Sequence, residues 1–148
     1  EGDLLPRLKQ MSIALDVMDR VEFLEPVPTQ MLSQVATQYD FGITMGRMNV
    51  LNHQYAVGFK TFENLSAGLA LILPESYPLK KFNQEYNVGI TYSDATVEEL
   101  ERIFEYILHH KEEIKVWKEN ARLAYHREYN PKRQQEKLIE KIKELLNA

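Results

Sequence analysis

A lysine and a glutamate stand one helical turn apart at the start of a predicted helix. The segment Tyr55–Leu73 indicates a loop, a helix that opens near Gly58, a stop at Gly68 and a short buried strand. Lys60 falls in the first turn of that helix and Glu63 lies one turn further on. The first N–H groups of a helix lack partners within it and carry partial positive charge, so a lysine beside them strengthens a phosphate site. A carboxylate just behind can hold vicinal hydroxyls, and the pair therefore indicates a site for a nucleoside diphosphate.

The same residues also fit a plainer interpretation. Lys60 and Glu63 have the i,i+3 spacing of a surface ion pair, which is worth a few tenths of a kcal/mol. Gly68 is expected to end the helix as a C-cap rather than to contact a ligand. Gly42 lies inside a predicted strand, where it indicates either close approach of a ligand or simple packing. The apolar residues of the helix are expected to pack on the sheet: Phe59, Phe62 and Leu65.

Composition limits the class of protein. The chain has 148 residues, of which 44% are hydrophobic and 27% charged, and these values are typical of one globular domain. Its net charge of -4 and pI of about 5.6 give no basic field for nucleic acid. The absence of cysteine excludes disulfides and thiolate metal sites. No apolar run approaches the ~18 residues of a membrane helix, so we expect a soluble, cytoplasmic protein.

Strands and helices are expected to alternate along the chain. The predicted strands are Val21–Leu24, Asp40–Thr44, Leu69–Leu73 and Val88–Thr91. The predicted helices are Leu4–Leu15, one that starts near Pro28, one that starts near Gly58, Leu79–Tyr86, Thr96 to about His110, Lys111–Glu128 and Pro131–Leu146. Residues 45–56 are expected to form a loop. The inward positions of the helix after Thr96 are predicted to be Val97, Leu100, Ile103, Phe104 and Ile107. This alternation predicts parallel βαβ units in a three-layer α/β domain, whose ligands bind at the carboxyl ends of the strands.

The histidines offer little chemistry. His53 lies in the loop that faces the proposed cleft, where it either touches a donor sugar or is an ordinary loop residue. No set of histidines and carboxylates has the spacing of metal ligands, so we expect no metal site and no cofactor. The glycine-rich phosphate loops of nucleoside triphosphatases and dinucleotide-binding proteins are also absent from the sequence.

Four segments carry a resemblance to a known family. They read VEFLEPVP, YDFGITM, GFKTFENLSAGLALIL and FNQEYNVGITYSD, in that order. Together they resemble the C-terminal nucleotide-sugar-binding half of retaining GT-B glycosyltransferases, the group that includes families 1 and 4 and many lipopolysaccharide and capsule enzymes. The later run NARLAYHREYNPKR is similar to the family's closing helices. The resemblance implies a Rossmann-like parallel sheet with C-terminal helices, one half of a GT-B fold.

The resemblance also implies roles for individual residues. Glu63 would accept hydrogen bonds from both ribose hydroxyls, and Lys60 would face the diphosphate; these two are the expected catalytic residues. Many relatives carry a glutamate eight positions before the one that Glu63 matches, whereas Tyr55 stands there in this chain. The full expected donor-binding set is Val27, Pro28, Thr44, Gly58, Phe59, Lys60, Thr61 and Glu63.

From the resemblance we expect residues 1–148 to be part of a donor-binding domain, without the N-terminal acceptor domain and the first strands. The expected partners are a nucleotide-sugar donor and an acceptor that the sequence does not identify. The absent domain would provide any peripheral membrane contact, and the exposed sheet edges favour self-association. The implied reaction is glycosyl transfer with retention, in polysaccharide, lipopolysaccharide or glycoconjugate synthesis, with the fragment alone inactive. Two alternatives stay open, a non-catalytic degenerate module for protein interaction and a sugar-nucleotide epimerase.

Overall fold

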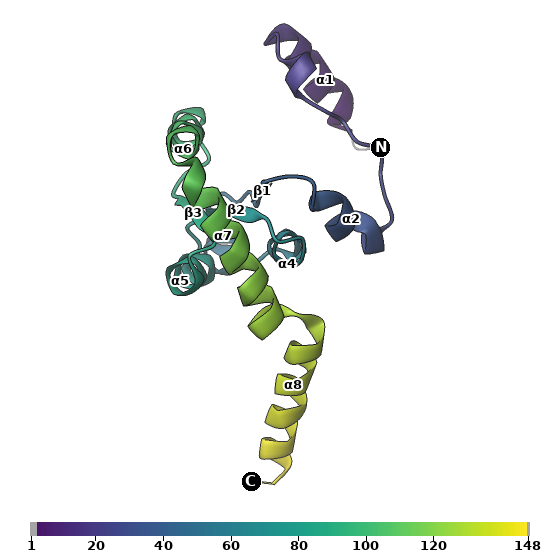
Figure 1. The fold of residues 1–148 in the computed structure, drawn as a ribbon, viewed down its shortest axis with the longest axis vertical. Helices are drawn as coiled ribbons and strands as arrows, with labels where there is room; N and C mark the ends of the chain where they lie inside the picture. The colour runs from purple at the N-terminus through teal and green to yellow at the C-terminus, as the bar shows by residue number, and fades with distance from the viewer. Residues whose placement is uncertain (1–2, 148) are drawn as a thin grey trace.

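A three-stranded parallel sheet lies at the centre of the molecule. The computed structural model describes residues 3–147, and Figure 1 shows its ribbon. The strands are β1 (Phe41–Ile43), β2 (Ala70–Pro74) and β3 (Gly89–Tyr92), in the order β1-β2-β3. Gly42 pairs with Leu71, and Ile72 pairs with Ile90. The predicted α/β class with a parallel sheet is confirmed.

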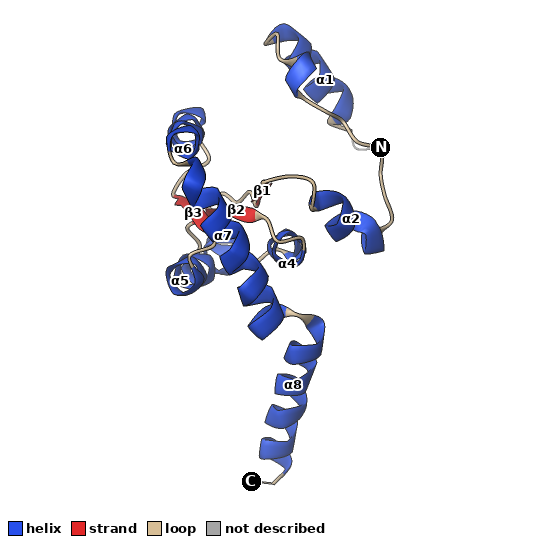
Figure 2. Ribbon diagram, in the orientation of Figure 1, coloured by secondary structure: helices blue, strands red, loops and turns tan. Residues whose placement is uncertain are grey.

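Helices surround this sheet, as the blue elements around the red strands in Figure 2 show. The helical elements of the described residues, including α1 and α8 that extend away from the sheet, are α1 (Leu5–Ala14), the short 3₁₀ helix η1 (Met18–Arg20), α2 (Thr29–Ala36), α3 (Leu51–Tyr55), α4 (Phe59–Ser66), α5 (Tyr77–Tyr86), α6 (Val97–His109), α7 (Lys111–Ala124), the π-helical segment η2 (Tyr125–Tyr129) and α8 (Pro131–Leu146).

The core consists of two apolar clusters, one on each face of the sheet. Strand β2 is buried along its whole length and alternates its side chains between the two faces. On one face the members are Leu65, Leu71, Leu73, Leu79, Phe82, Val88, Ala121 and Ala124. On the other face they are Ala70, Ile72, Tyr92, Ile103, Ile107 and Trp117. Since α4 and α5 supply the first cluster and α6 the second, the domain has the three layers that the sequence predicts.

Helix α7 passes along the amino ends of the strands. It contributes Trp117 to one cluster and Ala121 to the other, so it reaches both faces of the sheet. It also contacts the residues that come just before each strand. These contacts are Lys118 with Asp40 ahead of β1, Arg122 with Gly68 ahead of β2, and Asn120 with Asn87 ahead of β3. With the amino ends covered by α7, the carboxyl ends are left as the edge where a ligand can approach.

The predicted strand Val21–Leu24 is wrong. Val21 has extended backbone angles (φ -116°, ψ 117°), but the segment pairs with no other strand among residues 3–147. Val21 and Leu24 are exposed. A β-branched, apolar segment forms a strand only where a neighbouring strand satisfies its N–H and C=O groups. The sequence pattern of this segment does not predict whether a strand is available to pair with it.

Two other expectations need correction. Residues 45–56 are not only a loop, because they contain the short helix α3, held by the bond from the Gln54 side chain to the Met48 carbonyl (2.8 Å). In α6, Ile103 is buried as predicted, whereas Val97 is 76% and Phe104 45% exposed. The sheet and α7 cover only the stripe through Ile103 and the residue four positions later, so the flanking positions lie beyond the contact.

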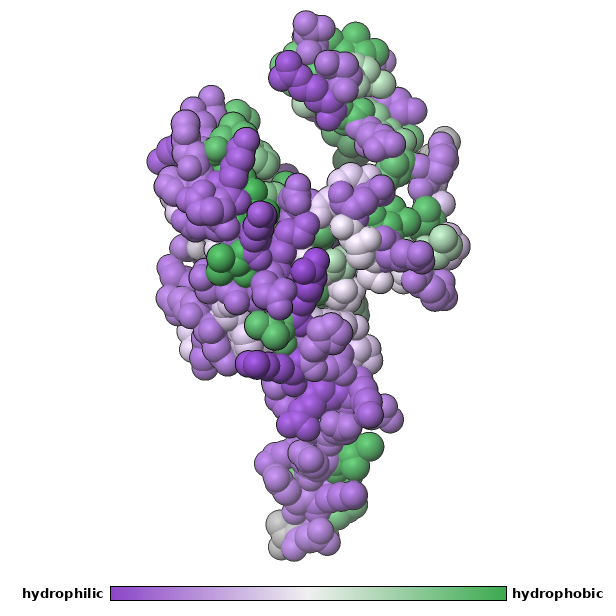
Figure 3. Space-filling model, in the orientation of Figure 1, coloured by the Kyte–Doolittle hydropathy of each residue, from purple (hydrophilic) through white to green (hydrophobic). Residues whose placement is uncertain are grey.

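Both ends of the chain extend away from the sheet, as Figure 1 shows for α1 and α8. Much of the apolar face predicted for the first helix is exposed, including Leu8 and Met11, each 47% exposed. Figure 3 shows the hydrophobic residues of α1 and α8 in green on the surface. No helix within residues 3–147 is both long and apolar enough to cross a membrane.

Candidate donor-binding site

Helix α4 begins at the carboxyl edge of the sheet. Its cap residue is Gly58, which has no side chain to accept a hydrogen bond from the first N–H groups. The segment just before it is held by a bond from the Ser76 hydroxyl, after β2, to the Ala56 carbonyl (3.2 Å). In the first turn of the helix, the Thr61 hydroxyl lies 3.3 Å from the hydroxyl of Thr44, the residue directly after β1. The start of α4 therefore lies where β1 and β2 end, as the sequence predicts.

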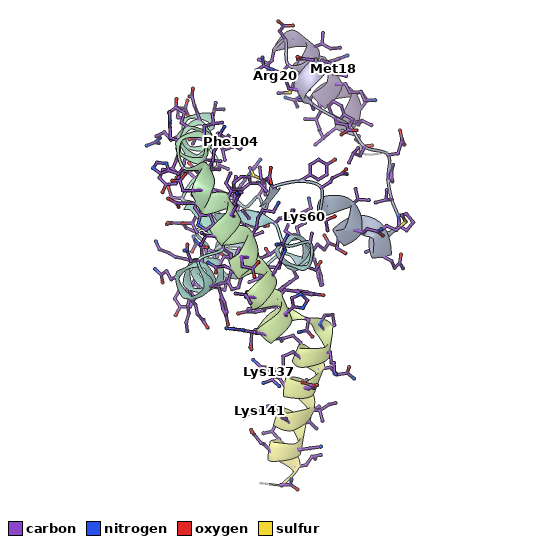
Figure 4. All side chains as sticks on the ribbon, in the orientation of Figure 1. Met18, Arg20, Lys60, Phe104, Lys137 and Lys141 are labelled. Atoms are coloured by element: carbon purple, nitrogen blue, oxygen red, sulfur yellow. The ribbon has the colours of Figure 1, made fainter. Side chains whose placement is uncertain are left out.

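Lys60 and Glu63 occupy this helix as expected. Lys60 is exposed in the first turn (Figure 4), and Glu63 is half-buried in the next. The Glu63 carbonyl accepts from the Ser66 hydroxyl at 2.8 Å and from the Ala67 N–H at 3.1 Å. The alternative of a surface ion pair is not seen, because none of the ion pairs within residues 3–147 joins Lys60 to Glu63. The ammonium of Lys60 can therefore meet an anion at the helix start without first leaving Glu63.

Two members of the expected set lie beneath the surface. Thr61 is 1% and Thr44 7% exposed, and their hydroxyls share a hydrogen bond. The Thr61 N–H donates to the Gly58 carbonyl at 3.0 Å. In this structure the groups of Thr61 that could meet a phosphate are therefore engaged within the protein. Their visible role is to join the helix to the sheet.

Val27 and Pro28 directly precede α2. Pro28 caps α2, and Figure 1 shows the amino end of α2 pointing away from the sheet. Phe59, the first residue of α4, is 87% exposed, so its predicted packing against the sheet is wrong. Phe59 lies two positions before the buried Thr61, about 200° around the helix, so its side chain faces away from the sheet. Leu65, one and a half turns later, is 1% exposed and packs as predicted.

The glycines of this region serve packing. A Cβ at Gly42 would overlap the side chain of Asn64 on α4, so the close approach there is made by a protein side chain. Gly68 has φ +68°, a conformation that favours glycine, and its N–H donates to the Leu65 carbonyl at 3.0 Å. The predicted C-cap is confirmed, and the packing interpretation of Gly42 agrees with the structure.

His53 lies on α3, in the segment after β1. Its Nδ1 accepts a hydrogen bond from the Arg47 N–H (2.9 Å), which leaves Nε2 as the ring nitrogen that carries hydrogen in the neutral form. Tyr55 ends α3 and is 67% exposed. Within residues 3–147, no three histidine, aspartate or glutamate side chains gather as metal ligands.

Sequence reasoning missed Tyr92, the last residue of β3. Its side chain is 1% exposed, and its hydroxyl accepts from the Gly46 N–H (2.8 Å) and donates to the Thr44 carbonyl (2.9 Å). Burial raises the pKa of Tyr92 above its usual value of 10.0. The available signal was a tyrosine at the carboxyl end of a predicted strand, where a buried hydroxyl must find partners in the neighbouring loop.

One cavity adjoins α4, and a wider cleft lies elsewhere along the sheet. An apolar pocket of about 180 Å³ adjoins the helix and includes Val57, Thr61 and Phe62. A wider cleft of about 520 Å³ lies along β3 and α6, with Thr91 and Arg102 in its wall, and it includes neither Lys60 nor Glu63. Size alone would favour the larger cleft, but it lies away from the uncapped helix start.

The chain matches one family of known proteins. Residues 6–140 match the family described as glycosyl transferase-like. The chain belongs to this glycosyl transferase-like family. No curated protein and no solved structure matches it. The match spans the sheet, the candidate site and most of α8, so the helix that carries Lys60 and Glu63 is part of the family's domain.

Proposed function

We propose that this chain binds the donor of a glycosyltransferase, a sugar linked to a nucleoside diphosphate. The observation that carries the proposal is an exposed lysine in the first turn of a helix whose cap is glycine, at the carboxyl edge of a parallel sheet. A site of this kind attracts phosphate through the helix N–H groups and the ammonium together. Membership of a glycosyl transferase-like family makes glycosyl transfer the class of reaction that such a ligand would serve.

In this proposal Lys60 faces the diphosphate and stabilises the charge that develops on it as the sugar–phosphate bond breaks. Glu63 accepts hydrogen bonds from the ribose hydroxyls and so fixes the nucleoside. Each bond to a charged acceptor is worth roughly 1.5–3 kcal/mol. The sugar is transferred with retention of its anomeric configuration, to an acceptor in polysaccharide, lipopolysaccharide or glycoconjugate synthesis. We expect the segment after β1, where His53 and Tyr55 lie on α3, to supply the wall of the site.

The proposal is tested by calorimetric titration of the chain with UDP and with GDP. One diphosphate is expected to bind, and Glu63→Ala is expected to weaken its binding at least tenfold. Glu105→Ala, which removes an exposed carboxylate from α6, serves as the matched control and should leave binding unchanged. Equal binding by the parent chain and Glu63→Ala would refute the role of Glu63. A folded chain that binds neither diphosphate would favour a module without catalytic function.

A further inference from the structure

The hydroxyl of Tyr92 connects two strand ends across the sheet. Tyr92 ends β3, whereas the groups that its hydroxyl contacts all follow β1: the Thr44 carbonyl, the Gly46 N–H and, at 4.0 Å, Met45 Sδ. Strand β2 lies between β1 and β3, so the phenol ring spans its carboxyl end. The ring itself packs in an apolar cluster with Ile72 and Ile103. A phenylalanine would satisfy that cluster equally well, so the hydroxyl serves the segment after β1 and not the core.

Thr44 links the Tyr92 hydroxyl to helix α4. Its N–H donates to the Ile72 carbonyl on β2 at 3.0 Å, and its carbonyl accepts from Tyr92. Its hydroxyl meets that of Thr61, and its methyl lies 3.9 Å from where a Cβ would stand on Gly58. One buried residue thus contacts β2, β3 and the first turn of α4. Any shift of Thr44 moves the helix start relative to the strand ends.

Gly46 begins the segment that carries α3. Immediately after it, the Arg47 N–H donates to Nδ1 of His53, so the position of this histidine depends on the course of the chain at Gly46. The hydroxyl of Tyr92 therefore fixes two parts of the candidate site. One is the start of α4 with Lys60, and the other is the segment with His53.

We propose that Tyr92 is a positioning residue of the donor site, whose hydroxyl sets the spacing between the start of α4 and the segment after β1. This inference rests on the proposed function. It assigns no contact between Tyr92 and the ligand, because the Tyr92 side chain is buried. The effect on the ligand passes through Thr44 and Gly46, and it should appear in nucleotide affinity more than in global stability.

The test compares Tyr92→Phe with Tyr106→Phe. Tyr106 is the control, since its hydroxyl also donates a hydrogen bond, to Glu113 Oε1 at 2.7 Å, but this bond joins α6 to α7 and involves neither α4 nor the segment after β1. Tyr92→Phe is expected to speed amide hydrogen exchange at Gly46 and to weaken binding of the preferred diphosphate at least fivefold. Tyr106→Phe should change neither quantity. The urea midpoints of the variants show whether each remains folded at the conditions of the titration.

Thr44→Val provides a second route if Tyr92→Phe does not fold. This substitution removes the hydrogen bond between the Thr44 and Thr61 hydroxyls while keeping a side chain of nearly the same shape. It leaves the bond from the Gly46 N–H to the Tyr92 hydroxyl in place. It should weaken nucleotide binding while Gly46 exchange stays at the parent rate. If the parent chain binds diphosphate and both variants bind it equally well, the positioning role is refuted and the proposed function stands. If the parent chain binds none, the proposed function fails and the positioning role fails with it.

Discussion

The hydroxyl oxygens of Thr44 and Thr61 lie 3.3 Å apart in the interior of the domain. This contact joins the residue after β1 to the first turn of α4, and both side chains are buried. A buried hydrogen bond is directional, so it fixes the helix more closely than apolar packing alone. Lys60 immediately precedes Thr61, so this contact also fixes the position of Lys60 at the edge of the sheet.

Replacement of Lys60 is expected to weaken binding of nucleoside diphosphate. A charge-assisted contact to phosphate contributes about 1.5–3 kcal/mol, so Lys60→Gln should raise the dissociation constant at least tenfold. Lys81→Gln, an exposed lysine on α5, is the control and should have no effect. Titration at increasing salt provides a further check, because the loss caused by Lys60→Gln should shrink as salt screens the charge. An unchanged affinity in Lys60→Gln would contradict the assignment of the phosphate to this helix.

The stability contributed by Glu99 is expected to depend on pH. Its carboxylate accepts from the N–H groups of Ser93 (3.0 Å) and Asp94 (2.6 Å) in the turn after β3. Partial desolvation opposes ionisation, but these bonds outweigh it and lower the pKa of Glu99 below its ordinary value of 4.5. Since the folded state has the lower pKa, the contribution is present above about pH 4.5 and is lost as the pH falls through the folded pKa.

Urea unfolding of the parent chain and Glu99→Gln measures this effect. The difference in unfolding free energy between them should be larger at pH 7 than at pH 3. Glu105→Gln, also on α6, should show no such change between the two pH values. A difference for Glu99→Gln that is the same at both pH values would show that its carboxylate is not preferentially ionised in the fold.

Alkaline pH is expected to destabilise the aromatic cluster around Tyr86. Burial, assisted by the nearby Glu85 carboxylate, raises the pKa of Tyr86 from 10.0 to about 12. The folded state thus favours the neutral phenol, and its contribution is present below pH 10 and is lost as the pH rises through about 12. Between these values the parent chain should lose more unfolding free energy than Tyr86→Phe does. Tyr77→Phe, at a 70% exposed position of α5, should behave like the parent.

Addition of a methyl group at Gly89 is expected to disrupt the sheet. A Cβ there would overlap the carbonyl oxygen of Leu71 on β2, which is backbone and cannot turn aside. Overpacking of this kind costs about 1–3 kcal/mol or more, and Gly89→Ala should lower the unfolding free energy by at least that amount. Gly58→Ala is the control, because its nearest neighbour would be the Thr44 methyl at 3.9 Å. Similar urea midpoints for the two variants would argue against the pairing of β2 with β3.

The parts of the fold that the sequence predicts are those with strong local signals. Continuous apolar runs predict β2, and the Thr96 cap predicts the start of α6, where the Thr96 hydroxyl accepts from the Glu99 N–H (3.2 Å). Gly68 predicts the end of α4. Each of these features is decided within a few residues, by backbone angle, capping or burial, so the sequence pattern alone is sufficient.

The errors concern what a segment packs against. The pattern of Val21–Leu24 is typical of a strand but does not identify a strand for it to pair with. The apolar character of Phe59 does not reveal that it lies on the helix face opposite the buried Thr61. The same limit applies to the site. The position of Lys60 follows from helix signals. The bonds from Tyr92 to Gly46 and Thr44 join residues that are 46 and 48 positions apart, so only the folded structure reveals them.

The course of α7 along the amino ends of all three strands has a consequence for the order of folding. Its side chains complete both apolar clusters, yet it follows every strand in the chain. During synthesis the sheet therefore stays open at that edge until residue 124 has emerged. Because these late contacts span long sequence separations, we expect the sheet and α7 to become stable together in one cooperative step.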